Sequence, residues 1–234
     1  KFVAEGIKMV LEAINFDKLD KLYVSESAFD RTAQRLGDKL ERIPYEVVAD
    51  NVFKQISDTV TPQGVLATVN MPEYDVKEIL SDERKAWVLL DDLRDPGNLG
   101  TIIRTSEGAG MSGVIMSKES VDLFNPKVVR STMGAIFRVK FCYVESLIDI
   151  IEEIKKSGYD VYATAMEGSE VYDCVDYTKG SAFIIGNEAN GVSDAVFEKA
   201  SKRIRIPMEG KLESLNAAVS AAIIMYEMAR QKRK

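Results

Sequence analysis

The sequence contains no histidine among its 234 residues. Histidine is the side chain that most readily exchanges a proton near neutral pH, and it is a common metal ligand. Its absence therefore excludes histidine-based catalysis and histidine metal ligation. Cysteine is scarce as well, and the two that occur, Cys142 and Cys174, lack the spacing of metal ligands. We interpret both as buried or idle thiols in a reducing compartment.

Long apolar runs are also missing. The longest apolar stretch without a charge, Ser214 to Tyr226, has 13 residues, whereas a helix that spans a bilayer needs about 20. No basic segment followed by an apolar one opens the chain. We therefore expect a soluble, cytoplasmic protein without a membrane segment. Its 46% apolar and 29% charged residues suffice for one large globular domain or two small ones.

The net charge of −6 is unevenly distributed along the chain. Residues 1–84 carry 11 basic and 16 acidic side chains, whereas residues 199–234 carry 9 basic and 3 acidic ones. Two interpretations of the basic C-terminal segment stay open. Its cations contact the phosphates of a nucleic acid, or they only complement the dipole of a solvated helix end.

Helix-like and strand-like apolar spacings alternate along the chain, which predicts an α/β protein with a mainly parallel sheet covered on both faces. The charged run 73–85 is the best linker candidate. It separates a small α/β domain, residues 1–72, from a larger domain, residues 86–234. Strands are expected at 22–24, 47–48, 64–69, 87–90, 113–116, 159–163, 182–185 and 203–206, and helices at 7–14, from about 98, at 147–156, at 193–200 and from 214.

Three loops rich in glycine and polar residues follow predicted strands, at 91–100, 186–193 and 207–216. Open α/β sheets bind ligands beyond the carboxyl ends of their strands. In the first loop, Pro96 and Gly97 suit a tight reversal and Asn98 suits a helix N-cap, with Arg104 on the exposed side of that helix. A G-x-G-x-x-G pattern at 108–113 closes this helix instead of opening one, so we interpret it as a helix C-cap and not as a dinucleotide site.

Three sequence blocks together carry a family resemblance. They read NLGTIIR at 98–104, IIGNEANG at 184–191 and IPMEGKLESLN at 206–216. In this order and separation they resemble the three motifs of the SpoU (TrmH-like) RNA 2′-O-methyltransferases of the SPOUT superfamily. Residues 2–6 and 61–67 resemble the small substrate-binding domain that often precedes the catalytic one. Two departures are Ala189, where relatives commonly have glycine, and the opening at Lys1, where relatives often begin with further basic residues.

The resemblance implies a C-terminal SPOUT domain whose parallel sheet contains a deep trefoil knot, preceded by a small α/β RNA substrate-binding domain. It also implies a homodimer whose active site lies close to the subunit interface. The knot loops of the family hold S-adenosylmethionine, and the reaction needs no metal because this methyl donor is already activated. The residues that the resemblance assigns to cofactor binding are Gly186, Ile206, Leu215, Thr164, Asn187 and Met208.

The implied reaction is attack of a ribose 2′-hydroxyl on the methyl group of the cofactor. Relatives place the equivalent of Arg104 at this hydroxyl. A guanidinium with a pKa above about 12 hardly loses its proton in a protein, so we expect Arg104 to orient phosphate and stabilise alkoxide character, not to act as the base. The other residues that the resemblance assigns to ordering the site or relaying the proton are Asn98, Glu188, Ser214 and Asn216.

Three alternatives stay open at this point. A base nitrogen could receive the methyl group, although the Ser214–Asn216 block and Arg104 favour ribose. The chain could also be a non-catalytic RNA-binding homologue, although all three motifs are intact. Structured RNA is the expected partner. This RNA could be transfer RNA, although the N-terminal domain favours ribosomal RNA.

Overall fold

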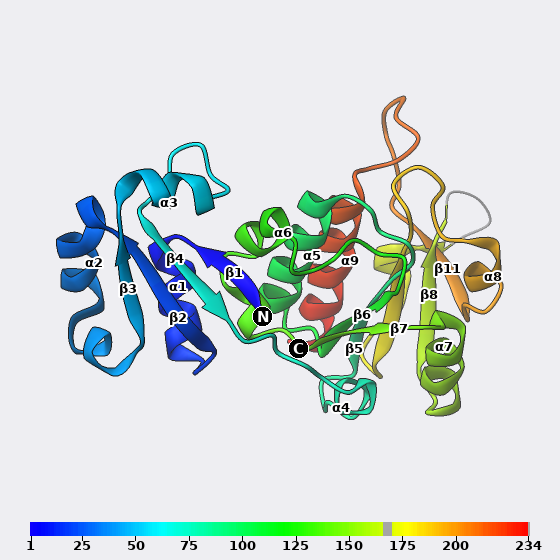
Figure 1. Ribbon diagram of the computed structural model, residues 1–234. Helices are drawn as coiled ribbons and strands as arrows, with labels where there is room; N and C mark the ends of the chain where they lie inside the picture. The colour runs from blue at the N-terminus through cyan, green and yellow to red at the C-terminus, as the bar shows by residue number, and fades with distance from the viewer. Residues whose placement is uncertain (166–169, 234) are drawn as a thin grey trace. The chain divides into compact units, whose positions relative to one another are not determined.

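The computed structural model describes residues 1–165 and 170–233, and Figure 1 shows the course of the chain. The chain divides into two units. Unit 1 consists of Lys1–Pro72 and Phe124–Phe137, and unit 2 of Glu73–Leu123 and Arg138–Lys234. Among the described residues no helix is both long and apolar enough to cross a membrane.

Unit 1 is built on a four-stranded sheet with the order β1-β4-β2-β3. β4 runs antiparallel to both of its neighbours, and β3 runs parallel to β2. The apolar side chains of β2 and β4 that point into the core, such as Leu22, Val24 and Val69, are fully buried. The strands of this unit are β1 (Phe2–Glu5), β2 (Leu19–Ser25), β3 (Tyr45–Val48) and β4 (Val65–Val69), and its helices are α1 (Ile7–Asn15), α2 (Phe29–Leu36), α3 (Asp50–Ile56) and α6 (Pro126–Ser131).

The segment 124–137 lies in the stretch expected as the second domain, yet it belongs to unit 1. Aromatic contacts explain this. The ring of Phe2 lies 5.0 Å from that of Phe124 and 6.1 Å from that of Phe137, measured between centroids. Phe16 stacks on Phe137 at 6.1 Å. Pairs of this kind stabilise beyond the area that they bury, so the two stretches of chain form one core.

Unit 2 contains a seven-stranded sheet with the order β7-β6-β5-β10-β8-β11-β9. All of the strand pairs in the described part of this sheet are parallel, which confirms the predicted α/β class. The trefoil knot implied by the family resemblance stays a prediction. The strands are β5 (Ala86–Leu90), β6 (Gly113–Ser117), β7 (Phe141–Val144), β8 (Asp160–Thr164), β9 (Glu170–Val171), β10 (Ser181–Ile185) and β11 (Lys202–Arg205).

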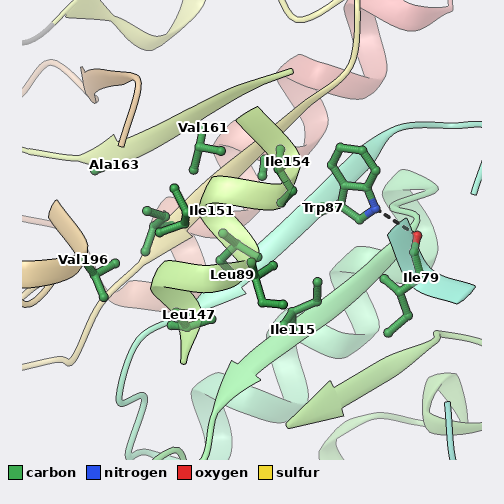
Figure 2. Packing of buried hydrophobic residues seen from close by; sticks show 13 residues of the cluster. Ile79, Trp87, Leu89, Ile115, Leu147, Ile151, Ile154, Val161, Ala163 and Val196 are labelled. Carbon is green, nitrogen blue, oxygen red and sulfur yellow. Dashed lines mark hydrogen bonds between the residues drawn. The ribbon is translucent and has the colours of Figure 1, made fainter. Parts of the chain in front are cut away.

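Helices cover both faces of this sheet (Figure 1). α5 (Pro96–Ala109) and α9 (Ala217–Lys232) pack side by side on one face, and α7 (Leu147–Lys156) and α8 (Asp194–Phe197) lie on the other. On the α7 face, side chains of the helices interdigitate with alternate residues of the strands (Figure 2). The buried indole of Trp87 donates a hydrogen bond of 3.0 Å to the carbonyl of Ile79. Ile79 belongs to α4 (Val76–Leu80), within the stretch expected as a linker, and is fully buried.

Helix starts differ from the sequence prediction at two of the glycine-rich loops. α5 begins at Pro96 and its N-cap is Asp95, whose Oδ1 accepts a hydrogen bond of 2.8 Å from the amide of Asn98. The prediction that Asn98 is the N-cap was therefore wrong, because Pro96 takes the first helical position that suits proline. α9 begins at Ala217, later than the predicted Ser214. At the other end of α5, Gly110 adopts φ 70°, which confirms the C-cap interpretation of residues 108–113.

Candidate active site

The three glycine-rich loops leave the sheet at one edge, because parallel strands all present their carboxyl ends there. The first follows β5 and the second follows β10, and these strands are neighbours. The amide of Asp91 donates a hydrogen bond of 2.9 Å to the carbonyl of Ile185, which continues the pairing into the loops. The buried carboxylate of Asp91 accepts one of 2.8 Å from the amide of Ser193. The start of the first loop is therefore fixed to both ends of the second.

A chain of side-chain hydrogen bonds joins all three loops. Nδ2 of Asn98 donates to Oε1 of Glu188 over 2.9 Å, and Nδ2 of Asn216 donates to Oδ1 of Asn98 over 2.9 Å. Asn98 is buried in the first turn of α5. Because its amide is both a donor and an acceptor, this one side chain connects the second loop to the third.

The carboxylate of Glu188 is also held by the backbone of the first loop. It accepts hydrogen bonds from the amides of Arg94 and Asp95 at 3.1 and 3.0 Å. Partial burial acts to raise its pKa, but the hydrogen bonds from the Asn98 side chain and from the two backbone amides outweigh this effect, so the pKa of Glu188 lies below its ordinary value. Glu188 is therefore an anion at neutral pH.

The second loop closes on itself in a tight turn. The backbones of Asn187 and Gly191 exchange two hydrogen bonds of 2.9 Å. A Cβ atom on Gly186 would lie 2.1 Å from the carbonyl carbon of Gly191, so only glycine fits there. Gly191 adopts φ 71°, a conformation that favours glycine. Ala189 is not among the described residues with positive φ, so the departure from the family pattern at this position causes no backbone strain.

A cavity of about 670 Å³ opens between the second and third loops. Its volume lies within the usual range for small-molecule sites. Its wall combines apolar side chains, such as Ile185 and Ile224, with amide, hydroxyl and carboxylate groups. The cavity contains on its wall all six residues expected to bind a cofactor, namely Thr164, Gly186, Asn187, Ile206, Met208 and Leu215, together with the expected catalytic residues Glu188, Ser214 and Asn216.

Two expected catalytic residues, Asn98 and Arg104, are not among the described residues that line this cavity. Asn98 is hydrogen-bonded to Glu188 and Asn216, which do line it. Arg104 is exposed on α5. Asn98 and Arg104 are six residues apart, which corresponds to about 1.7 helical turns. Arg104 therefore points to another side of the helix than Asn98. Within one chain, the structure does not bring Arg104 to the cavity.

Sequence reasoning missed several residues of the site. The carboxylate of Asp91, which holds Ser193, lies in a loop that had been singled out but had no assigned role. Ser220 and Ile224 line the cavity from α9. Their spacing of four and eight residues from Asn216 places them on one face of the helix, and this periodicity is the signal that would have found them.

The basic C-terminal segment is tied into the structure. Arg230 forms an ion pair with the buried carboxylate of Glu227, at 2.7 Å. Nζ of Lys232 donates to the carbonyls of Arg84 and Lys85 at 2.5 and 3.1 Å, and burial lowers the pKa of Lys232. These contacts favour the structural interpretation of the tail over the phosphate-binding one.

The polar groups of the cavity wall come from the backbone and from several kinds of side chain. Among residues 1–165 and 170–233, no group of three or more cysteine, aspartate or glutamate side chains is arranged to hold a metal ion. The donors of the cavity wall are backbone amides, hydroxyls, side-chain amides and the guanidinium of Arg205. A nucleoside derivative, which carries both apolar surface and hydrogen-bonding groups, fits a wall of this composition and volume.

Comparison with known proteins supports the same reading. Residues 85–226 match the model of the SpoU rRNA Methylase family, and residues 3–75 match the RNA 2′-O ribose methyltransferase substrate binding model. The chain is 35% identical to the 23S rRNA (guanosine(2553)-2′-O)-methyltransferase RlmP of Bacillus subtilis, over 97% of this chain and 88% of that protein.

Solved structures agree. The SpoU methyltransferase AviRb from Streptomyces viridochromogenes, in complex with the cofactor AdoMet, superposes with a TM-score of 0.87 at 29% identity, over 99% of this chain and 90% of that chain. The AdoMet-bound rRNA methyltransferase from Sinorhizobium meliloti gives a TM-score of 0.85 at 32% identity, over 98% and 87%. Taken with the joined loops and the cavity, these matches show that the chain belongs to the SpoU rRNA methylase family.

Proposed function

We propose that this protein transfers a methyl group from S-adenosylmethionine to a ribose 2′-hydroxyl of ribosomal RNA. The observation that carries the proposal is the hydrogen-bonded connection Glu188–Asn98–Asn216, which joins the three family motifs at the rim of one cavity. Family membership and the cofactor agree with the prediction from sequence. Ribosomal RNA as the substrate would place the enzyme in the cytoplasm.

Ribosomal RNA is favoured over transfer RNA by the relatives that match nearly the whole chain. RlmP of Bacillus subtilis and the Sinorhizobium meliloti enzyme, both matched over 97% or more of this chain, carry rRNA in their names. The Aquifex aeolicus TrmH/SpoU tRNA modifying enzyme matches over 67% of this chain, with a TM-score of 0.58.

The cofactor would be held by the cavity wall. Gly186 and Ile206 offer backbone groups directly after β10 and β11, and Leu215 offers its backbone from the third loop before α9. Thr164, Asn187 and Met208 complete this part of the wall. Oδ1 of Asn187 already accepts hydrogen bonds from the amides of Ala189 and Asn190. This side chain therefore stabilises the loop rather than contacting the ligand. S-adenosylmethionine supplies an electrophilic methyl group, and the protein has to bring the hydroxyl to it.

Glu188 orders the site and does not act as the general base. A general base works best with a pKa near the operating pH, whereas the hydrogen bonds at Glu188 lower its pKa. Its charge instead fixes Asn98 and the start of α5. Asn216 holds the third loop in place, and Ser214 stands on the cavity wall as a hydroxyl available for proton relay.

Arg104 completes the site in a homodimer. It is exposed on α5, and the same side of the helix carries Gly108 one turn later. A Cβ atom on Gly108 would lie 3.1 Å from the hydroxyl of Tyr226, so α9 borders this surface. Val219 and Tyr226, 47% and 48% exposed, add apolar area to it. Two copies that pair across this surface would bury these side chains and enclose Arg104 at the interface, where its guanidinium can orient an RNA phosphate.

The test combines cofactor binding with mapping of the product. The protein is incubated with labelled S-adenosylmethionine and 23S rRNA, and the methylated position is located by its resistance to alkaline cleavage, which needs a free 2′-hydroxyl. A protected phosphodiester next to the labelled nucleotide is expected. Label on a base nitrogen, or cofactor binding without any transfer to RNA, would contradict the proposal.

A further inference from the structure

Unit 1 contains a second cleft, of about 400 Å³, between α2 and the loop that precedes β4. Its lining combines apolar side chains with hydrogen-bond donors. The described residues that line it include two arginines and no carboxylate: Ile7, Arg31, Thr32, Arg35, Pro62, Gln63 and Val65.

The wall opposite α2 is held rigidly. Gly64 adopts φ 77°, and a Cβ atom there would lie 2.5 Å from both Ala28 Cβ and Ser25 Oγ. The backbone of the loop is fixed at both sides, because the amide of Ser25 donates to the carbonyl of Gly64 and the amide of Gly6 donates to that of Val65, each at 2.9 Å. The cleft is therefore a built feature of the fold and not a chance gap between side chains.

The two guanidinium groups share one side of the cleft. Arg31 and Arg35 are four residues apart on α2, a spacing that places side chains on the same helix face and makes like charges repel. Nη2 of Arg31 donates 3.1 Å to the carbonyl of Gln63, across the cleft. The guanidinium has five N–H donors, and this is the single hydrogen bond that the described structure gives it. Arg35 forms none with the described residues and is exposed.

This cationic pair stands out from its surroundings. Residues 1–72 carry nine basic and eleven acidic side chains, and residues 124–137 add two basic ones, so the unit as a whole is neutral. Acidic partners neutralise two of the other cations of residues 1–72, in the ion pairs Lys1–Asp20 and Lys21–Glu46. A pair of guanidiniums without a described ion pair, next to partly buried apolar side chains, suits a nucleotide, whose phosphate takes the charge and whose base contacts the apolar side chains.

We propose that this cleft binds a nucleotide of the RNA substrate, with Arg31 and Arg35 on its phosphate. The inference rests on the proposed function, since it assumes that RNA is the substrate, and it names the residues by which unit 1 would hold that RNA. The partly buried side chains of Ile7 and Pro62 would contact the base without selecting its identity. The cleft would thus contribute affinity rather than sequence preference.

The experiment measures binding of the full chain to a fluorescent 23S rRNA transcript at several salt concentrations. Neutralising Z phosphates makes log K fall with log [salt] in proportion to Z. We expect Arg31→Ala/Arg35→Ala to weaken binding about tenfold or more at physiological salt and to reduce the salt slope by about 1 to 2. Arg35→Ala alone, which breaks no described contact, should give about half of the slope change. Arg42→Ala, an exposed arginine of the same unit outside the cleft, is the matched control.

The results separate this inference from the proposed function. Affinity for S-adenosylmethionine should be the same in all variants, because the residues that line the cleft do not line the cofactor cavity. The thermal midpoint should be the same in Arg35→Ala, which breaks no described contact. An unchanged RNA affinity and salt slope in Arg35→Ala and in the double variant, with methyl transfer by the wild type intact, would overturn the cleft alone. If the wild type transferred no methyl group, and the double variant still bound RNA more weakly than the wild type, the proposed function would be overturned and the cleft would stand.

Discussion

Asn216 donates a hydrogen bond from Nδ2 to Oδ1 of Asn98 over 2.9 Å, although 118 residues separate them in the chain. The same side chain caps α9, since Oδ1 of Asn216 accepts the amides of Ala218 and Val219. One asparagine therefore both starts a helix and ties the third loop to the first. The two helices that begin at these loops, α5 and α9, pack against each other.

Breaking this connection should destabilise the protein. Asn98→Ala removes the acceptor of Asn216 and a donor of Glu188, and a buried hydrogen-bonding group left without its partner costs about 1–3 kcal/mol. Asn216→Ser keeps an oxygen that can cap α9 and loses the reach to Asn98. Urea unfolding of both single variants and of the double variant should give a coupling free energy of about 1 kcal/mol. Strictly additive effects would show that the two asparagines act independently.

The stability contributed by Glu188 should depend on pH. Its pKa in the folded protein is lowered from the ordinary 4.5, so it contributes stability that is fully present above that value and is lost as the pH falls through the folded value. The difference in unfolding free energy between wild type and Glu188→Gln should be constant from pH 6 to 7.5 and shrink below pH 4.5. A difference that instead grows on acidification would mean that the carboxyl is held in its neutral form.

Two glycines of the second loop should respond differently to alanine. Gly186→Ala forces a methyl group within 2.2 Å of Gly191 and Val192 backbone atoms, so the loop must move and the cavity wall with it. We expect a large loss of S-adenosylmethionine affinity in calorimetry. Gly191→Ala meets no atom within 4 Å and suffers only from its positive φ, at about 1–2 kcal/mol. Equal cofactor affinities in the two variants would contradict this account of the cavity.

Arg104 should matter for transfer and not for cofactor binding. Arg104→Ala removes a guanidinium that lies outside the cavity wall of its own chain, so the dissociation constant of S-adenosylmethionine should stay unchanged. Loss of one preorganised charge at a developing oxyanion slows turnover about 10²–10³-fold, and we expect a decrease of that order in transfer to 23S rRNA. Arg104→Lys keeps the charge but not the bidentate geometry and should be intermediate. Unchanged turnover in Arg104→Ala would remove this residue from the mechanism.

The exposed face of α9 should control assembly. Val219→Glu and Tyr226→Glu place charges on a surface that the proposed homodimer buries, and both side chains lie two turns apart on one side of the helix. Sedimentation should give a dimer for the wild type and a monomer for the double variant, with methyl transfer lost as well. Leu212→Glu, a change at a 70% exposed apolar residue in the third loop outside the helix, controls for added charge. A monomeric wild type would contradict the proposal.

Much of unit 2 could be predicted from sequence because its strands are short, continuous apolar runs. β5, β6, β8, β10 and β11 were all expected within a residue or two of their observed bounds, and α7 was expected at Leu147–Lys156 as observed. β7 was missed because, at the edge of the sheet, only Phe141 of its four residues is buried and Tyr143 is exposed. Edge strands lack the double-sided burial that makes a run recognisable.

The sequence predicted which residues line the site better than it predicted which hydrogen bonds join them. The motifs named the residues that line the cavity, since loops at strand ends carry function. The role of Asn98 depended on the N-cap of α5, which lies at Asp95, three residues before the expected position, so the Asn98 side chain was expected at a cap and not between Glu188 and Asn216. The orientation of Arg104 relative to Asn98 is set by their spacing of six residues in the helix.

Unit 1 is discontinuous in the chain, and this restricts how the protein can be divided. A fragment that stops at residue 72 would keep Phe2 and Phe16 but lose Phe124 and Phe137, the rings that they pack against. Swapping N-terminal modules between family members at a single junction would consequently graft half of an aromatic cluster. Chimeras built to transfer RNA preference have to exchange residues 124–137 together with the first 72, as two coordinated cassettes.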